Sequence, residues 1–445
     1  MQNPSAPVVE TRQGALTGLT DENVHRWCGI PYAAPPVGDW RWRSPRPPER
    51  WDGVRDATAF SASSWQSSEY CQELGGGDPG QFSEDCLYLN VWSPVDRPGS
   101  LPVMVWLHGG GFTIGAGGLP PYHGKSLAAR GVVVVTINYR LGHLGFFAHP
   151  ALEGEEERVV HNFALLDQIA ALEWVRENIT AFGGDPHNVT LFGESAGARS
   201  VLSLLASPLT APLNIAPAPI VGDCVLPEAM LDVFFAARQH PVPVMIGSNS
   251  DEASVMAVFG IDLAGQIQKL RRERRFGLGL IKLLYPGVKG DEELGRQVCR
   301  DMAFTTMGYV VMQAQQRVGG LCWRYWFDYV AEAEHATYIN GAWHGNEVPY
   351  VFDTLGQVEP SRQYVNERDL QFAARVADYW VSFARDAGTH DSLSGPTHWP
   401  ACRKGRDVLL RIGVNKHAGF RLENRFMHAR MSLFKRVMKH HVSLD

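Results

Sequence analysis

One short stretch constrains the fold of this chain more than any other: Val-Thr-Leu-Phe at 189–192 followed by Gly-Glu-Ser-Ala-Gly at 193–197. The first four residues form a short apolar run, which is typical of a buried strand. Residues 201–206, Val-Leu-Ser-Leu-Leu-Ala, continue as a helix. Ser195 is therefore predicted to lie in a tight turn between a strand and a helix, the setting of an exposed serine nucleophile.

Glycine is expected two residues before and two residues after this serine for a steric reason. A strand-to-helix turn this tight puts Ser195 in strained backbone geometry, and a side chain at Gly193 or Gly197 would collide with its neighbours. The helix that follows directs its N-terminus, the positive end of its dipole, at the serine. The five-residue pattern alone occurs by chance in many chains, so its position between strand and helix carries the argument.

Strand and helix patterns alternate along the rest of the chain. We expect an antiparallel opening over residues 7–60, a compact part that ends at Trp399 and Pro400, and a closing helix over 425–439. Further strands are predicted at 87–92, 101–107, 131–138, 243–247 and 322–329, and helices at 165–178 and 378–384. This spacing favours a single α/β domain over residues 1–445, with a mostly parallel central sheet that helices cover on both faces.

Composition excludes several classes of function. With 45% apolar and 20% charged residues the chain is an ordinary globular protein, and its net charge of -6 argues against nucleic acid as a partner. No stretch reaches the ~18 apolar residues of a membrane span, and the first residues do not resemble a signal peptide, so a cytoplasmic protein with no membrane contact is expected. The seven cysteines lack metal-ligand spacing, and we expect no metal and no cofactor. Cys71 and Cys86 flank a glycine-rich segment, and a bond between them that closes this loop is left as an open alternative.

A glycine run follows the predicted strand 101–107: His-Gly-Gly-Gly-Phe at 108–112. Three successive glycines after a buried strand allow backbone N–H groups to face a ligand closely, and an anion hole is the physical use. The alternative is a plain flexible loop. His108 is expected only to orient this loop.

A serine hydroxyl needs a base within hydrogen-bond reach, and the base needs an acid that fixes its tautomer. In this fold class the chain order is nucleophile, acid, base. Ser195, Glu252 and His344, each after a predicted strand, satisfy that order. The residues alone leave other histidines open as the base, and Asp251 and Glu347 open as the acid.

Seven motifs together resemble the type-B carboxylesterase and cholinesterase family of α/β-hydrolases, in particular its bacterial para-nitrobenzyl-esterase-like carboxylesterases. They run in family order and lie at 83–91, 108–112, 138–140, 178–186, 193–197, 249–252 and 344–347. The resemblance extends from about residue 8 to 400. It implies an α/β-hydrolase fold and a hydrolase of carboxylic esters whose only partner is a small-molecule ester, with short- to medium-chain or aryl esters expected.

The resemblance also implies roles for single residues. Ser195 corresponds to the nucleophile, His344 to the general base and acid, and Glu252 to the third member of the triad. The reaction would be a two-step hydrolysis through an acyl-enzyme intermediate.

Further residues match family positions close to the triad. Gly110, Gly111 and Ala196 would donate backbone N–H groups to the oxyanion. Glu194 and Ser200 would support the site through hydrogen bonds.

Three departures from the family pattern matter. Ala253 follows Glu252 where the family usually has glycine, and residues 72–85 lack the tryptophan that stacks on choline, which argues against choline esters. After Ser207 roughly 60 residues of the family pattern are absent, whereas connections in compact domains are usually only a few residues long. A central strand would then be missing, for which Asn214 and Ile215 are a poor replacement.

Two explanations of this shortened region after the nucleophile helix stay open. Either the printed sequence omits a segment, or the chain carries a true deletion with a rewired sheet and a wide, lidless pocket. A non-catalytic binding or scaffold protein of the same fold is the alternative function, but such proteins usually lose the serine or the histidine. A true lipase would need a large apolar lid from the region that is absent.

Overall fold

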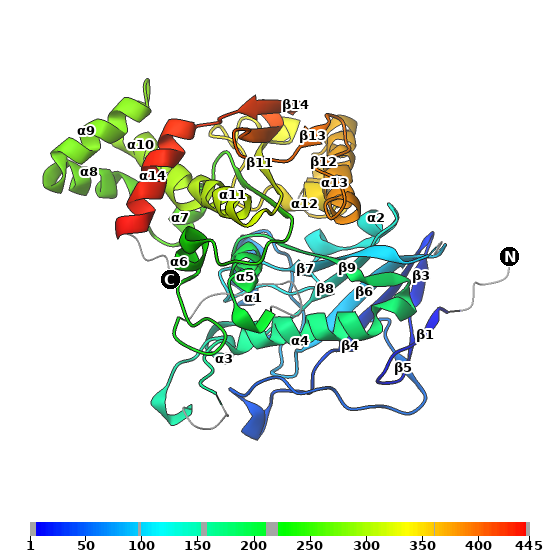
Figure 1. Cartoon of the computed structure of the whole chain (residues 1–445). Helices are drawn as coiled ribbons and strands as arrows, with labels where there is room; N and C mark the ends of the chain where they lie inside the picture. Colours follow the sequence, from blue (N-terminus) through cyan, green and yellow to red (C-terminus); the bar gives the residue numbers. More distant parts are fainter. Residues whose placement is uncertain (1–5, 97–98, 153–157, 211–220, 360, 442–445) are drawn as a thin grey trace.

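The strands of this chain form two larger sheets instead of one continuous sheet (Figure 1). The computed structural model describes residues 6–96, 99–152, 158–210, 221–359 and 361–441. The six-stranded sheet has the order β3 (Leu19–Asp21), β4 (Val24–Pro31), β6 (Tyr88–Pro94), β8 (Val133–Ile137), β7 (Leu101–Leu107) and β9 (Gly184–Gly193). The three-stranded sheet has the order β10 (Val244–Asn249), β11 (Cys322–Tyr329) and β14 (Val408–Asn424).

The strands nearest the site pair in parallel, as predicted. β7 pairs with β8 and with β9, and β11 pairs with β10 and with β14, all in parallel. Every residue of β8, Val-Val-Val-Thr-Ile, is buried, because a parallel sheet covered on both faces leaves no strand surface to water. The antiparallel opening is also confirmed: β1 (Val8–Glu10) pairs antiparallel with β2 (Ala15–Thr17).

Helices pack on both sheets, which confirms the α/β-hydrolase architecture. α4 (Phe163–Asn178) and α5 (Ala196–Leu204) pack against β9, and α11 (Thr306–Val318) packs against β10 and β11. α13 (Glu367–Asp386) contacts both sheets through β7, β9 and β14. Its first turn is fixed by a capping box between Asn366 and Asp369, so the helix begins well before the predicted 378.

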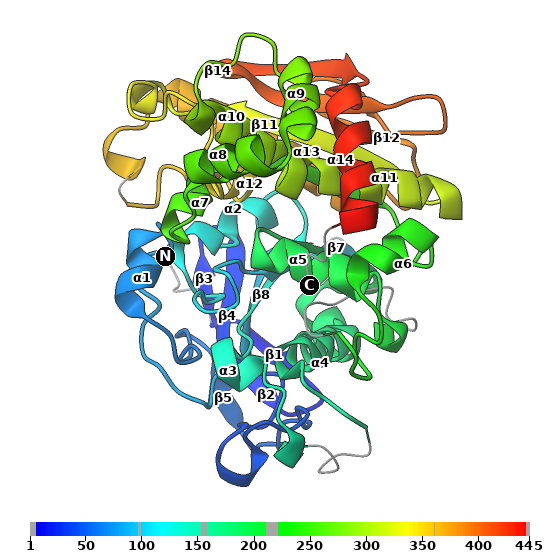
Figure 2. The same cartoon turned by 90° about the vertical axis from the view of Figure 1, so that its left-hand side faces the viewer.

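The compact part does not end at Trp399 and Pro400, so that prediction is wrong. Strand β14 extends the three-stranded sheet beyond that point, with its apolar start at Val408 buried against β11. The predicted closing helix is present as α14 (His428–His441), which buries Phe434 against α8 (Leu263–Glu273) and α9 (Arg275–Leu284), beside which it lies in Figure 2. The sequence does not reveal this strand, because its apolar start is short and most of its later residues are polar and partly exposed.

The sheet is interrupted between β9 and β10. Within the described ranges, no strand pairs with the outer edge of β9 or with the outer edge of β10. Whereas β8 is wholly buried, most residues of β9 and half of β10 are only partly buried. After α5 the chain passes through Pro208–Thr210 to α6 (Met230–Ala236) and then to β10; Asn214 and Ile215 lie outside the described residues.

The remaining sequence expectations concern the thiols and the membrane. All seven cysteines are free, and Cys71 and Cys86 are both buried thiols, so the structure does not close a loop between them. No described helix has the length and apolar character needed to cross a membrane.

Candidate active site

Ser195 occupies the sharp turn between β9 and α5 (Ala196–Leu204), with φ 52° and ψ -119°. A Cβ at Gly193 would lie 2.6 Å from the carbonyl carbon of Gly197, and a Cβ at Gly197 would overlap the carbonyl oxygen of Leu107. The prediction that side chains at positions 193 and 197 would collide with their neighbours is therefore confirmed. The geometry stores backbone strain at one half-buried serine, at the N-terminus of a helix.

The imidazole of His344 lies directly against this serine. Its Nε2 is 2.8 Å from Ser195 Oγ, and its Nδ1 is 2.5 Å from Glu252 Oε2. Because a carboxylate can only accept, the neutral form of the imidazole carries its proton on Nδ1, which leaves Nε2 to accept from the hydroxyl. The backbone N–H of His344 donates to Ser254 Oγ at 3.0 Å, which fixes the loop that carries the ring.

Glu252 is held by the strand that precedes it. Its Oε1 accepts the backbone N–H of Asn249, at the end of β10, at 2.7 Å, while its Oε2 faces His344. The two other acids that the sequence left open take different partners. Asp251 pairs with Arg296 at 2.5 Å, and Glu347 accepts from the side chain of Asn249 at 2.5 Å.

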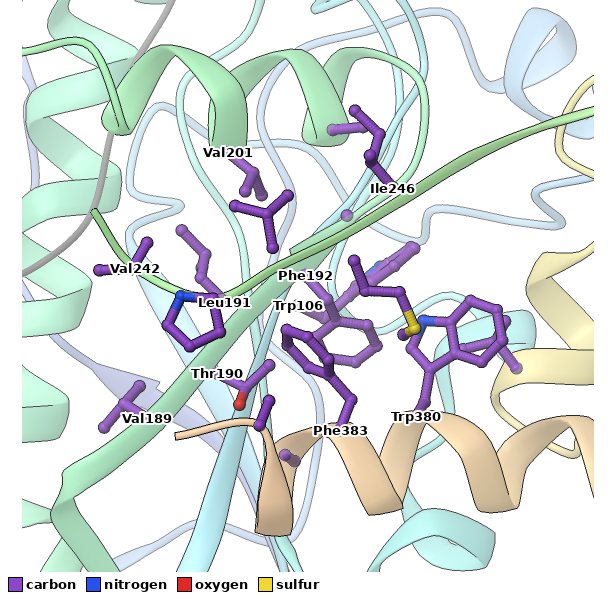
Figure 3. A pocket seen from close by; sticks show the side chains of 18 of the residues that line it. Trp106, Val189, Thr190, Leu191, Phe192, Val201, Val242, Ile246, Trp380 and Phe383 are labelled. Carbon is purple, nitrogen blue, oxygen red and sulfur yellow. The ribbon is translucent and has the colours of Figure 1, made fainter. Parts of the chain in front are cut away.

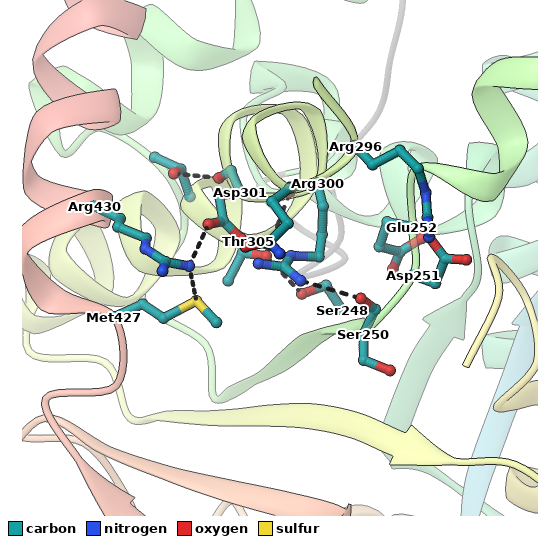
Figure 4. Close-up of polar contacts among 12 residues, drawn as sticks. Ser248, Ser250, Asp251, Glu252, Arg296, Arg300, Asp301, Thr305, Met427 and Arg430 are labelled. Carbon is teal, nitrogen blue, oxygen red and sulfur yellow. Dashed lines mark hydrogen bonds and ion pairs between the residues drawn. The ribbon is translucent and has the colours of Figure 1, made fainter. Parts of the chain in front are cut away.

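A cluster of arginines fastens the loop that carries Glu252 (Figure 4). Arg296 comes from α10 (Asp291–Cys299), and Arg300 begins the π-helical turn that follows it. Arg300 donates to the carbonyl of Ser250 at 3.3 Å and to the fully buried Asp301 at 2.7 Å. Sequence reasoning missed these two arginines, because their partners lie 45 and 50 residues away along the chain.

A further carboxylate faces the same imidazole. Glu194 Oε1 lies 3.1 Å from His344 Nε2. Burial lowers the pKa of His344, but the negative charges of Glu194 and Glu252 outweigh it and raise that pKa to about 10. Burial in turn raises the pKa of Glu194, and raises that of Glu347 to about 8. The carboxylates around His344 therefore stabilise its imidazolium form.

The glycine loop lies against the serine turn. A Cβ at Gly109 would lie 3.2 Å from the Cβ of Ser195. Gly110 and Gly111 have φ of +102° and +60°, a region that favours glycine. Among the described residues no acceptor contacts the backbone N–H groups of Gly110, Gly111 or Ala196, so these three donors are free to bind an anion.

Supporting roles are predicted for His108 and Ser200, and the two side chains have different surroundings. His108 is buried, its Nδ1 hydrogen-bonds the carbonyl of Gly109 at 2.9 Å, and its ring stacks on Tyr139 at 4.3 Å. Burial lowers the pKa of His108 to about 4, so the ring is neutral and orients the loop. Ser200 accepts from Gln168 at 3.0 Å, and none of its hydrogen bonds in the described part of the chain reaches Ser195 or His344.

Ala253 replaces the glycine that the family usually has after its acid. Its φ of -67° and ψ of -12° are ordinary helical values, so its methyl group causes no strain. Within the described residues, no group of three or more His, Cys, Asp or Glu side chains has the arrangement of a metal site.

Parallel strands next to the site, a serine in a strained strand-to-helix turn, and a histidine and a glutamate from later post-strand loops define the α/β-hydrolase class of serine hydrolases. The comparisons with known proteins narrow this class. A sequence model of the carboxylesterase family matches residues 5–215 and 292–432, so the chain belongs to the carboxylesterase family and is a carboxylesterase.

Two relatives and two solved structures match this chain over nearly its whole length. Para-nitrobenzyl esterase of Bacillus subtilis (strain 168) is 34% identical over 480 residues, covering 91% of this chain and 94% of the relative. Fumonisin B1 esterase of Sphingopyxis macrogoltabida is 34% identical over 478 residues, covering 90% of this chain and 86% of the relative. The solved structure of a para-nitrobenzyl esterase gives a TM-score of 0.78 at 30% identity, over 96% of this chain and 99% of its own. A Geobacillus stearothermophilus carboxylesterase gives 0.80 at 29% identity, over 96% and 99%.

The alignment with the Bacillus subtilis esterase is longer than the part of this chain that it covers. It spans 480 positions but takes up only 91% of the 445 residues, about 405, so about 75 positions have no residue from this chain. The family model leaves residues 216–291 of this chain unmatched. The relative thus carries residues that this chain lacks.

Proposed function

We propose that this carboxylesterase hydrolyses small-molecule esters through an acyl-enzyme intermediate on Ser195, with His344 as general base and acid and Glu252 as its orienting carboxylate. One observation carries the proposal: the unbroken hydrogen-bond chain from Ser195 Oγ through the imidazole to Glu252 Oε2. A strained serine aligned with a base and an acid is the arrangement that activates a hydroxyl.

In the first step Ser195 Oγ attacks the ester carbonyl carbon, and its proton passes to His344 Nε2. The imidazolium is stabilised by Glu252 at Nδ1, and the adjacent carboxylate of Glu194 adds to this stabilisation. The carbonyl oxygen becomes an oxyanion, which accepts from the free N–H groups of Gly110, Gly111 and Ala196. One such donor is typically worth about 10²–10³ in turnover.

The tetrahedral intermediate then collapses. The C–O bond to the alcohol breaks, and His344 returns its proton to the departing alkoxide. Water attacks the acyl carbon while His344 takes its proton, and a second collapse releases the carboxylic acid as the proton returns to Ser195. The base and the acid of both halves are the same nitrogen, which the geometry keeps within reach of Ser195 Oγ.

The substrates we propose are short- to medium-chain or aryl esters. Support comes from the similarity to a relative named para-nitrobenzyl esterase. The ring of Phe304, whose centroid lies 5.4 Å from that of the His344 ring, offers an aromatic neighbour for such a group.

Hydrolysis of p-nitrophenyl esters from acetate to octanoate tests the proposal, with wild type, Ser195→Ala and Ser203→Ala compared at pH 8. Ser203 is a matched control, because it is a buried serine on α5 whose hydroxyl contacts Met230 instead of the triad. We expect Ser195→Ala to lose about 10⁴-fold or more in kcat and Ser203→Ala to stay within about threefold. Turnover retained by Ser195→Ala, or none by a folded wild type, would contradict the proposal; the latter would favour the binding-protein alternative.

A further inference from the structure

The interruption between β9 and β10 is a slot within the sheet layer. A cavity of about 420 Å³ lies there, lined by β9 on one side and by β10 on the other (Figure 3). Val201 points into it from α5, and Trp380 and Phe383 point into it from α13 on the opposite face. The slot is therefore bounded in the way that a strand inside a sheet is bounded: by strand edges on two sides and by helices on the other two.

The two strand edges run in the same direction. β9 leads into Ser195 and β10 leads into Glu252, and both of these side chains contact His344. The carboxyl ends of β9 and β10 therefore both lie next to the active site. A chain segment between them would be parallel to both neighbours, as β8 and β9 are to β7.

The side chains and backbone groups that line the slot indicate which kind of molecule it can bind. Its lining side chains are mainly apolar, and its charged groups, Glu194 and Glu347, lie at the end next to the active site. Both strands present backbone N–H and C=O groups that no described strand pairs on the slot side. An alkyl chain would leave these groups unsatisfied, whereas an extended peptide satisfies both edges.

We propose that the slot between β9 and β10 binds an extended, uncharged peptide segment of another polypeptide, which inserts as a parallel strand and joins the two sheets. A segment of about six residues matches the usual length of a strand. A further observation supports this occupant: β9 and β10 are only partly buried, whereas β8 is wholly buried. The proposal rests on the fold and does not require that Ser195 be catalytic.

Hydrogen exchange with a synthetic peptide tests the proposal in the Ser195→Ala variant, so that hydrolysis plays no part. The probe is capped Val-Val-Val-Thr-Ile, the sequence of β8, followed by a Gly-Lys-Lys tail for solubility, because the chain itself buries this strand between two neighbours. The control peptide is Val-Pro-Val-Pro-Ile with the same tail, since proline has no N–H to donate. We expect the probe, but not the control, to slow exchange in β9 and β10 by about 100-fold at a concentration of 100 Kd.

Two variants separate the slot from other binding surfaces. Val201→Trp fills the slot from α5 and should abolish the protection, whereas Leu283→Trp, on the exposed face of α9 and outside the slot lining, should leave it unchanged. Three results would overturn the proposal: no protection of β9 and β10, equal protection by both peptides, or equal protection by decanoate. The last result would identify the slot as a site for alkyl chains. A negative outcome leaves the proposed esterase mechanism untouched, because that mechanism is measured by ester turnover.

Discussion

The imidazole Nε2 of His344 lies 2.8 Å from the hydroxyl oxygen of Ser195, although 149 residues separate the two along the chain. Two post-strand loops produce this contact, one after β9 and the other after β11. Because each loop is fixed by its own local interactions, a substitution near either loop can weaken the contact.

The serine turn depends on Gly197. A methyl group there would overlap the carbonyl of Leu107, at the end of β7, so Gly197→Ala must displace either the turn or the strand. We expect kcat for p-nitrophenyl acetate to fall by about 10²-fold or more, with a lower midpoint of thermal unfolding. Gly279→Ala is the matched control, because a Cβ at this helical glycine meets nothing within 4 Å. That control should be neutral or stabilise the fold by up to about 1 kcal/mol. A Gly197→Ala enzyme with wild-type kinetics would contradict the steric argument.

The pH dependence of turnover should report the carboxylates around His344. Only the neutral imidazole can accept the serine proton, and the pKa of His344 is raised above its ordinary value, so kcat/KM should rise with pH through a midpoint above 6.5. Glu194→Gln removes one of the negative charges that raise this pKa, and the acidic limb should therefore move to lower pH.

A remote carboxylate provides the control for this shift. Glu334→Gln changes a half-buried acid whose pKa is raised by burial and which bonds Tyr364 instead of the site. Its pH profile should overlay that of the wild type. A Glu194→Gln profile that stays in place, or moves to higher pH, would show that Glu194 does not hold the proton on His344.

The stability of the fold should depend on one buried ion pair. Arg140 donates through Nε and Nη2 to both oxygens of Asp167, at 2.8 and 2.7 Å, and the two side chains are almost wholly buried. Asp167→Asn leaves a buried guanidinium uncompensated, and we expect the free energy of unfolding to fall by about 3–5 kcal/mol. Urea denaturation followed by circular dichroism measures the change. The exposed pair Arg403 and Asp391 is the control, and Asp391→Asn should leave the urea midpoint unchanged.

Continuous apolar runs made the central strands predictable from sequence. β7 and β11 have the same bounds as the predicted strands, because a strand buried on both faces is mainly apolar or aromatic. In β11 only Arg324 and Asp328 interrupt this pattern. The steric need for Gly193 and Gly197 was equally local. Strand β14 was missed, because its apolar start is short and its later residues are polar and partly exposed.

The choice of acid could not be made from the residues alone. Asp251 and Glu252 are adjacent in sequence, and only the pairing of Asp251 with Arg296, 45 residues away, separates their environments. The contact between Glu347 and Asn249 joins residues 98 positions apart and could not be predicted from the sequence either. Such contacts depend on how the loops pack in three dimensions, which periodicity and local spacing do not encode.

The assignment of Ser195 as the nucleophile has the most direct test. An organophosphate ester such as diethyl p-nitrophenyl phosphate transfers its phosphoryl group to an activated serine, and mass spectrometry of the digested protein locates the adduct. We predict one adduct per chain, on the peptide that contains Ser195, formed in step with the loss of ester turnover and strongly reduced in His344→Ala. An adduct on another residue, or full turnover after Ser195 is modified, would contradict the account.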